Sequence, residues 1–505
     1  MQKWWSRAAA PALSALALLS PCAPAGAKKP DPARKHTHET LVADTTELTD
    51  PTAVDEAEPG AAAAPQLAQV LRPVMAQYPA ILAAAQERET AAGEQTYARG
   101  AFDPYVKGKG AWVPEGHYPT RRFEAFLNQP TYVWGSSVFA GYRYGQGHFA
   151  VYDGKAETLD RGELRAGVTV PLLRDGYVDA KRAALWSSRL APAIAEASVG
   201  EKKNEIVRSV TLKYWGWVES GHALRIAHYL LRLAEDRNAG IKERVERGDL
   251  AEIEYADNQR AILARKSAIV SLERVAQGNA IELGFYLKGL TNAPDIAPDA
   301  AVPALPEPPP PTAHDLEQEV QAALERRPDI ARLVAQQKQL KIELSLARNQ
   351  VVPELDFTAQ VAKDMGLGPE RLEPLEVEVG LVLDVPLTAR SARGKRAQVT
   401  AKRAKLSLQA AVLRNRIAAD IQDAMVAEQT ARERLSLART ELGLARRLAE
   451  AERESFLLGN STLLVVNLRE QAVADAALKE VTALADYQRA AAVFQAVTAT
   501  QPTFE

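Results

Sequence analysis

The sequence predicts a mainly α-helical protein with some β-structure that is duplicated internally, with a β-hairpin and a pair of long helices in each half. Three observations lead to this fold class. They are two similar segments, a proline-rich break between them, and long proline-free stretches rich in Ala, Glu, Lys, Leu and Arg. Such a composition is typical of long helices. With 505 residues, the chain is also too long for one compact core.

The two halves contain similar features in the same order. The segment 165–185, RAGVTVPLLRDGYVDAKRAAL, resembles 378–399, EVGLVLDVPLTARSARGKRAQV, in its glycine, its Val-Pro-Leu and its Lys-Arg-Ala. Pro79 and Pro328, near the start of each half, are 249 residues apart, whereas Pro171 and Pro386 are 215 residues apart. We therefore predict a duplication in which the first half carries about 34 extra residues, at a period too long for a solenoid repeat. An additional external loop is expected between residues 113 and 131.

The first 27 residues have the pattern of an export signal. Lys3 and Arg7 precede a short apolar stretch, and an Ala-Gly-Ala cleavage site follows at 25–27. The single cysteine, Cys22, lies inside this signal, where it is either removed by cleavage or modified with lipid. We expect cleavage, because a proline precedes the cysteine and a good cleavage site follows it. Residues 28–64 have few large apolar side chains and are predicted to be disordered.

A proline-rich stretch at 294–314 predicts a stiff, extended connector, because prolines at this density cannot form a helix interior. It separates a first repeat at 65–293 from a second repeat at 315–500. In each repeat we expect a helix, then a β-hairpin at about 104–172 or 353–387, and then a long helical hairpin.

The strand predictions rest on alternating apolar and polar residues. Between Glu376 and Leu387, valine and leucine side chains point to one face, while acidic residues and glycine occupy most of the other. In the first half, residues 102–177 hold 14 of the chain's 31 aromatic residues. These could form the core of a small soluble β-domain or a belt at a membrane interface. We favour the membrane, because little other chain is available to cover the apolar faces.

The segment 389–458 has no proline and would span on the order of 100 Å as a helix. Ten positions in it follow alternating steps of four and three residues, and nine of the ten are apolar, which predicts a heptad seam with close helix packing. The ten positions are Ile417, Ile421, Ala424, Glu428, Ala431, Leu435, Ala438, Leu442, Ala445 and Ala449.

Each long helix is predicted to turn back at a glycine, which suits the left-handed residue that ends a helix. The residues after each glycine are good caps for the return helix, and in the first half Glu252 completes a D-x-x-E capping pattern. The predicted turns consist of Gly248, Asp249 and Leu250, and of Gly459, Asn460 and Ser461.

Motifs of catalysis are missing from the sequence. The seven histidines form no H-x-x-x-H pair, and neither a Walker loop nor a nucleophile elbow occurs. The balance of 62 basic and 64 acidic residues gives no electrostatic reason to expect nucleic acid as a partner. We expect neither an enzyme nor a bound cofactor or metal.

The paired Val-Pro-Leu strands with their Lys-Arg-Ala helix starts, and the turns ERGDLAEIEYADNQRA and LLGNSTLLVVNLREQA, resemble the TolC family of outer-membrane efflux proteins over about residues 65–500. The resemblance implies a homotrimer in which each chain gives four strands to one outer-membrane β-barrel. The helices would continue this barrel as a coiled-coil tunnel across the periplasm. The implied function is a passive exit duct of a tripartite efflux or type I secretion system, whose partners are a periplasmic adaptor (membrane fusion) protein and an inner-membrane pump.

The resemblance also implies roles for particular residues. Glu376, Glu378 and Asp384 would face the water-filled lumen, and the apolar row of the same strand would face outer-membrane lipid. The two helical turns would contact the adaptor. The family's tunnel-narrowing acid falls six residues after the turn glycine, where the first half has Glu254 and the second half departs from the pattern with Val465.

The alternative hypothesis is a periplasmic coiled-coil adaptor or scaffold protein without a pore. That hypothesis leaves the paired amphipathic hairpins without a purpose. Drugs, metals and exported proteins all remain open as substrates, because a passive duct serves each of them.

Overall fold

The computed structural model describes residues 65–296 and 302–500, which belong to one compact unit, Asp50–Glu505. The predicted export signal with its Cys22, the predicted disordered segment 28–64 and part of the linker lie outside the described residues. In the described part of the chain, no helix has both the length and the apolar content that crossing a bilayer requires.

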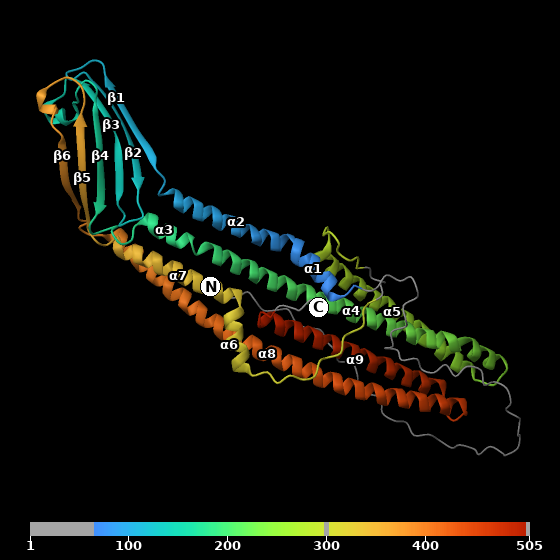
Figure 1. Cartoon of the computed structure of the whole chain (residues 1–505). Helices are drawn as coiled ribbons and strands as arrows, with labels where there is room; N and C mark the ends of the chain where they lie inside the picture. The colour runs from blue at the N-terminus through green and yellow to red at the C-terminus, as the bar shows by residue number, and fades with distance from the viewer. Residues whose placement is uncertain (1–64, 297–301, 501–505) are drawn as a thin grey trace, which may run out of the picture. The chain divides into compact units, whose positions relative to one another are not determined.

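The first half begins and ends with helices and holds four strands between them, within the described residues (Figure 1). Two helices lead into the strands, and one short and two long helices follow. The elements are α1 (Leu67–Gln77), α2 (Pro79–Gly100), β1 (Tyr105–Val113), β2 (Thr120–Pro130), β3 (Ser137–Gly147), the 3₁₀ helix η1 (Val151–Ala156), β4 (Glu163–Pro171), α3 (Ala180–Ser188), α4 (Ala191–Glu246) and α5 (Glu252–Leu287).

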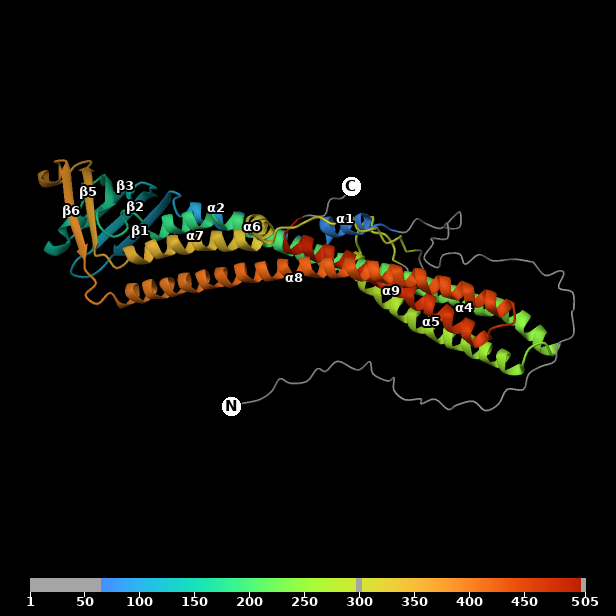
Figure 2. The ribbon, with the colours of Figure 1, turned by 90° about the horizontal axis from the view of Figure 1, so that it is seen from below.

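The second half has the same order of parts with two strands. Its two long helices run beside those of the first half (Figures 1 and 2). The elements are α6 (Leu316–Arg326), α7 (Pro328–Asn349), β5 (Glu354–Asp364), the 3₁₀ helix η2 (Glu370–Leu372), β6 (Glu376–Asp384), α8 (Arg390–Leu457) and α9 (Leu463–Val497).

The described strands form one antiparallel sheet in chain order, so β1 and β6 are its edges. The prediction of four strands per chain is therefore wrong, because the sheet has six. The second half has the single hairpin expected, but the first half has four strands in place of one hairpin. The extra residues of the first half form strands that extend the sheet. The external loop expected between residues 113 and 131 is short, because β2 occupies most of that span.

The helices that lead into the strands have matching lengths in the two halves. Helices α1 and α6 have 11 residues each, α2 and α7 have 22 each, and both pairs are offset by 249 residues. Pro79 and Pro328 start α2 and α7, and the residue before each proline is extended. The one helix expected before each group of strands is thus two helices. The duplication remains a prediction, which these lengths support.

The long helices follow the expected coiled-coil pattern. Helix α8 runs for 68 residues, and eight of its ten predicted seam positions are buried, while Glu428 and Ala445 are partly buried. These burials confirm the heptad seam. Helix α9 packs against both α8 and α4, and α5 packs against α4. The long helices therefore lie in the order α5–α4–α9–α8, with the sheet at one end and the two turns at the other (Figure 2).

From residue 302 to 314 the linker lies against the long helices without forming a helix or strand. Val302 is buried in a core that includes Tyr214 and Trp217 of α4. Farther along, Arg432 donates a 2.7 Å hydrogen bond to the carbonyl oxygen of Pro309. This segment, which we call the strap, thus contacts α4 and α8, and Gln488 of α9 donates a 2.8 Å hydrogen bond to its Pro306 carbonyl oxygen.

Candidate functional site

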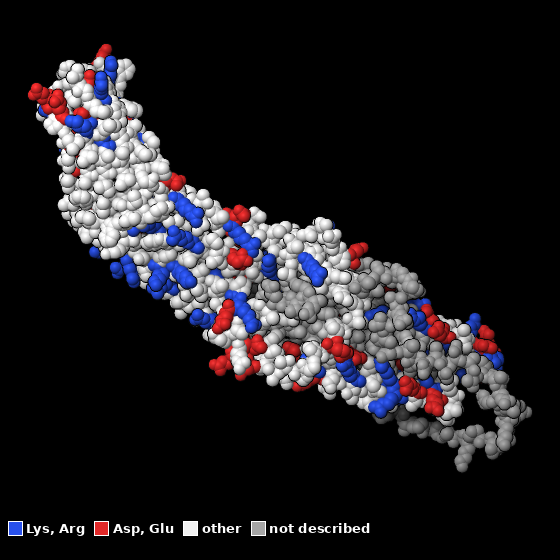
Figure 3. Space-filling view, viewed as in Figure 1, with Lys and Arg blue, Asp and Glu red and all other residues white. Residues whose placement is uncertain are grey.

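One face of the sheet is apolar and exposed. On β6, Val377, Val379, Leu381 and Leu383 are each 62–66% exposed. The strand register places other exposed apolar residues on the same face, and Figure 3 shows the sheet as a band without charged residues between charged side chains at its loop end and its helix end. Soluble monomers seldom expose an apolar patch of this size. The further residues of this face are Val106, Trp112, Phe123, Leu127, Val138, Leu164 and Val361.

The aromatic residues of the strand region 102–177 lie mainly on the surface. Trp112 is 69% exposed, Tyr132 57% and Tyr177 74%. The interpretation of this region as the aromatic core of a small soluble β-domain is therefore wrong. The exposed rings instead fit an apolar environment outside the sheet.

The opposite face of the sheet is polar. Glu163 on β4 is almost fully buried between Arg143 and Arg165, with 2.6 Å from its Oε1 to Nε of Arg165. Glu378 on β6 accepts a 2.6 Å hydrogen bond from Nε2 of Gln360. Glu376 lies 4.0 Å from Nη2 of Arg165. The carboxylates on this face are therefore paired in part by arginines and by an amide from neighbouring strands.

The three acidic residues expected to face a lumen lie on this polar face. Glu376 and Glu378 are each about half exposed, and Asp384 is exposed at the helix end of β6. The structure therefore separates them from the apolar row of the same strand, as the alternation predicted. Their role beside a water-filled lumen remains a prediction.

Both helical turns end at a left-handed glycine, as predicted. Gly248 has φ +78° and Gly459 has φ +80°. The amide of Asp249 donates to the carbonyl of Arg244, and the amide of Asn460 donates to that of Ser455, each at 2.9 Å. These six-residue hydrogen bonds define the Schellman motif, which satisfies the last carbonyls of a helix.

The predicted caps after the glycines are wrong. Helix α5 starts after Ala251, and α9 starts after Thr462, in both cases without a side-chain hydrogen bond to the helix. Ser461 donates a hydrogen bond to the carboxylate of Glu452 on α8 instead. The chain needs extra residues to reverse direction, so the return helix begins beyond the residues expected to cap it.

The tips of the hairpins expose apolar side chains. Leu457 is 81% exposed and Leu458 is 70% exposed, directly before Gly459. In the first hairpin, Asp249 is exposed and Leu250 is half-buried. Contact of these tips with an adaptor remains a prediction.

Glu254 lies in the first turn of α5 and is half-buried. Among the described residues none forms an ion pair with its carboxylate. Val465, at the matching position of α9, is also half-buried. The structure of one chain leaves the constriction role of Glu254 a prediction, because a ring of such acids needs several copies.

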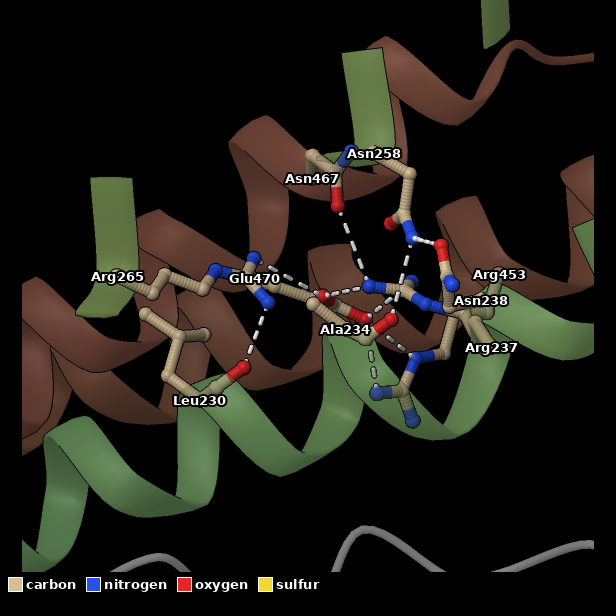
Figure 4. A network of polar contacts seen from close by, with 9 residues as sticks. All are labelled: Leu230, Ala234, Arg237, Asn238, Asn258, Arg265, Arg453, Asn467 and Glu470. Atoms are coloured by element: carbon tan, nitrogen blue, oxygen red, sulfur yellow. Dashed lines mark hydrogen bonds and ion pairs between the residues drawn. The ribbon is translucent and has the colours of Figure 1, made fainter. Parts of the chain in front are cut away.

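The sequence reasoning missed a buried charged cluster between the two hairpins (Figure 4). Glu470 of α9 is only 2% exposed and accepts bonds from both terminal nitrogens of Arg237 on α4, at 2.8 and 2.6 Å. Arg453 on α8 approaches to 3.0 Å and Arg265 on α5 to 3.5 Å. One carboxylate therefore joins all four long helices at a single level.

Buried amides extend this cluster. Asn467 accepts a 3.2 Å hydrogen bond from Arg237, and Asn258 donates to the carbonyl of Ala234 at 3.2 Å. Arg265 donates to the carbonyl of Leu230 at 2.6 Å, and its burial lowers its pKa against the opposing effect of Glu470. No local sequence motif could reveal this cluster, because its members come from four segments far apart in the chain.

Within the described residues, no group of three or more His, Cys, Asp or Glu side chains is placed to hold a metal ion. The features that distinguish the described part of the chain are the two-faced sheet, the exposed hairpin tips and the buried cluster. Together they describe a sheet with one exposed apolar face, joined to a row of long helices.

No protein-family model matches the sequence, and no curated protein matches it. Solved structures do match its fold. The outer membrane protein VceC of Vibrio cholerae is 14% identical with a TM-score of 0.61, over 86% of this chain and 96% of that one. The CmeC outer membrane channel of Campylobacter jejuni is 13% identical with a TM-score of 0.60, over 89% and 90% of the two chains.

A third match is the outer-membrane channel OprN, at 14% identity and a TM-score of 0.61, over 86% of this chain and 89% of that one. The fold is therefore that of outer-membrane channels. More narrowly, it is the fold of the TolC family, which confirms the resemblance predicted from the turns and the Val-Pro-Leu strands.

Proposed function

We propose that this chain is the subunit of an outer-membrane channel that works as a passive exit duct for substrates. Three copies close their sheets into one barrel in the outer membrane, and their helices continue it as a tunnel into the periplasm. The observation that carries the proposal is a sheet with one exposed apolar face, one polar face and two free edges, joined directly to long coiled helices.

Free sheet edges support closure by further copies. Unpaired strand edges are not tolerated in lipid, because their amide and carbonyl groups would lack hydrogen-bond partners. Three copies of the six-stranded sheet would make a barrel of eighteen strands. Barrels of about this strand number enclose a water-filled channel. The polar face would then line the lumen, and the apolar face would meet lipid.

The two outermost long helices also expose apolar residues that could pack against a neighbouring copy. Helices α5 and α8 stand at the ends of the row α5–α4–α9–α8, and each exposes an apolar stripe. A neighbouring copy would cover the α8 stripe of one chain with the α5 stripe of the next, which supports the same ring as the sheet edges. On α5 the stripe contains Leu263, Val270, Ile281 and Phe285, and on α8 it contains Leu408, Val412, Val426, Leu437 and Leu444.

An adaptor and an inner-membrane pump are the proposed partners. The exposed leucines beside Gly459 support a contact at the hairpin tips, since apolar side chains at the end of a long hairpin have no core of their own to join. In this proposal the pump supplies the energy, and the channel provides only the path.

Cell fractionation, unheated gel electrophoresis and planar-bilayer recording test the proposal together. We expect the protein in the outer-membrane pellet, a trimer on unheated gels, and stepwise ion currents from the purified trimer. A soluble monomer that gives no current would contradict the channel and favour the adaptor or scaffold hypothesis. Heated samples provide the control, because they should run as monomers.

A further inference from the structure

We propose that Lys107 and Lys109 on β1 of one copy pair with the acidic residues of β6 in the next copy. In this way, charge fixes how neighbouring sheets join. This inference rests on the proposed function, because it requires that copies assemble edge to edge. The partner of each edge is a second copy of this chain, and the acids concerned are Glu376, Glu378 and Asp384.

Strand β1, at one edge of the sheet, carries more positive charge than neighbouring residues of the same sheet neutralise. Lys107 and Lys109 point to the polar face of β1, and every residue of this strand is exposed. Among the described residues neither lysine forms an ion pair. Glu124 on β2 lies directly opposite Lys109, and this single carboxylate cannot balance both lysines.

The negative edge has the opposite excess. Asp384 lies directly opposite Glu354 on β5, and Arg174 forms its ion pair with Glu354 rather than with Asp384. Within the part of the chain that the structure describes, Asp384 has no ion pair. Glu376 and Glu378 are each about half exposed, although Arg165 and Lys155 approach them to 4.0 and 3.6 Å. Acids therefore remain available along the outer edge of β6.

The geometry of the sheet brings these two edges together. The meander makes β1 and β6 antiparallel, with Tyr105 and Asp384 at their helix ends. Suppose that Tyr105 of one copy is level with Asp384 of the next and that the polar faces of both sheets lie on the same side. Lys109 then lies opposite Gly380 and diagonal to Glu378. In the same register Lys107 lies diagonal to Asp384. Diagonal neighbours are about 7–8 Å apart, within reach of lysine side chains.

The pairing tolerates the stagger that a barrel requires. If β1 shifts by two residues in either direction along β6 of the next copy, the two polar faces still lie on the same side, because side chains alternate with a period of two. In each of these registers both lysines still lie opposite or diagonal to an acid. A slide of one residue would turn the lysines toward the apolar face of the neighbour, so charge and hydrophobicity select the same set of registers.

Charge reversal tests this inference. We expect Lys107→Glu together with Lys109→Glu to lower the temperature at which the trimer dissociates on gels. Adding Glu378→Lys and Asp384→Lys should restore it, because the two edges then carry exchanged charges. The matched control reverses Lys338 and Lys341, two exposed lysines of α7 outside the sheet, and should leave the dissociation temperature unchanged.

The outcomes separate this inference from the proposed function. If the wild-type trimer forms and conducts ions, but reversal of Lys107 and Lys109 leaves its dissociation temperature unchanged, the charge pairing is wrong and the channel stands. Reversal that weakens the trimer without rescue by the exchanged acids would also overturn the pairing. A wild-type chain that never assembles would overturn both.

Discussion

Gly221 of α4 lies where the linker crosses the helix. A β-carbon at this position would overlap the methyl groups of Val302, whose buried side chain belongs to a close-packed core. The stiff, branched valine cannot move aside by a simple rotamer change. The strap can therefore lie flat on α4 only because residue 221 has no side chain.

We predict that Gly221→Ala destabilises the folded chain by about 1–3 kcal/mol, because it overfills this contact. Gly240→Ala on the same helix is the matched control, since its β-carbon would meet nothing within 4 Å. The control should be neutral or slightly stabilising, because alanine favours helix. Thermal unfolding in detergent compares the two, and equal midpoints would contradict the close packing.

His222, next to this glycine, is buried and hydrogen-bonds to the carbonyl oxygen of Pro303 at 2.9 Å. Its burial, together with nearby Arg225, lowers its pKa from the usual 6.5 to about 4. Between these pH values the unfolded chain binds a proton that the folded chain does not. Folding stability from this residue is therefore complete above about pH 6.5 and is lost as the pH falls toward 4.

We predict that His222→Asn reduces the loss of stability between pH 7 and pH 4, by an amount on the order of 3 kcal/mol. Unfolding midpoints of the wild type and the variant across this range provide the measurement. Exposed His117 replaced by Asn is the control and should leave the pH profile as it is. Parallel profiles for wild type and His222→Asn would show that this histidine does not titrate as described.

Glu254 is the residue whose predicted role depends most on the assembled channel. If three copies bring it to a narrow point, Glu254→Lys should reduce cation selectivity and change the single-channel current. Glu252→Lys, two residues earlier and exposed, is the control for adding a positive charge near the same turn. An unchanged current in Glu254→Lys would rule out the constriction.

At the scale of elements, the buried Glu470 cluster decides how the two helical hairpins stay together. A carboxylate surrounded by three arginines is costly to bury, but removing it leaves guanidinium groups without a counter-charge. The cluster therefore fixes the relative level of α4, α5, α8 and α9 more than it adds to the total stability.

We predict that Glu470→Ala destabilises the helical part by about 3–5 kcal/mol. The control Glu282→Ala removes an exposed partner of Lys213 and should cost about 0–1 kcal/mol. Hydrogen exchange of the helical hairpins and thermal unfolding measure the difference. A loss in Glu470→Ala no greater than in the control would mean that the arginines find water or other partners.

The sequence was enough to predict elements with strong periodicity. The seam of α8 and the glycine turns follow from local spacing, because burial and left-handed φ angles leave a pattern within a few residues. Strand β2 was missed, since Arg121 and Gln129 interrupt its apolar row and its span was expected to be an external loop. The Glu470 cluster was missed for a different reason, as it is created only by packing of distant segments.

At the scale of the whole molecule, the meaning of the sheet depends on its surroundings. Val379 and Val382 of β6 are 62% and 57% exposed, on opposite faces. In water the two positions would tolerate a charge equally well. In a barrel, one would meet lipid and the other water.

We therefore predict that Val379→Glu reduces the amount of assembled trimer in the outer membrane, whereas Val382→Glu does not, because it adds an acid opposite Lys107 of the next copy. A charge on the lipid face destabilises a barrel, while a lumen position is solvated. Unheated gels of outer-membrane fractions provide the measurement. Equal amounts of trimer for both variants would contradict the assignment of faces.

The six strands have a consequence that follows from parity. Each strand reverses the direction of the chain. Inserting a single strand would therefore place α3 and α4 at the loop end of the sheet, opposite the other helices. Inserting two strands returns the chain to the side from which it left, and the helices can continue unchanged. A wall of this kind can therefore widen only in steps of two strands, and its width can evolve independently of the helices below it.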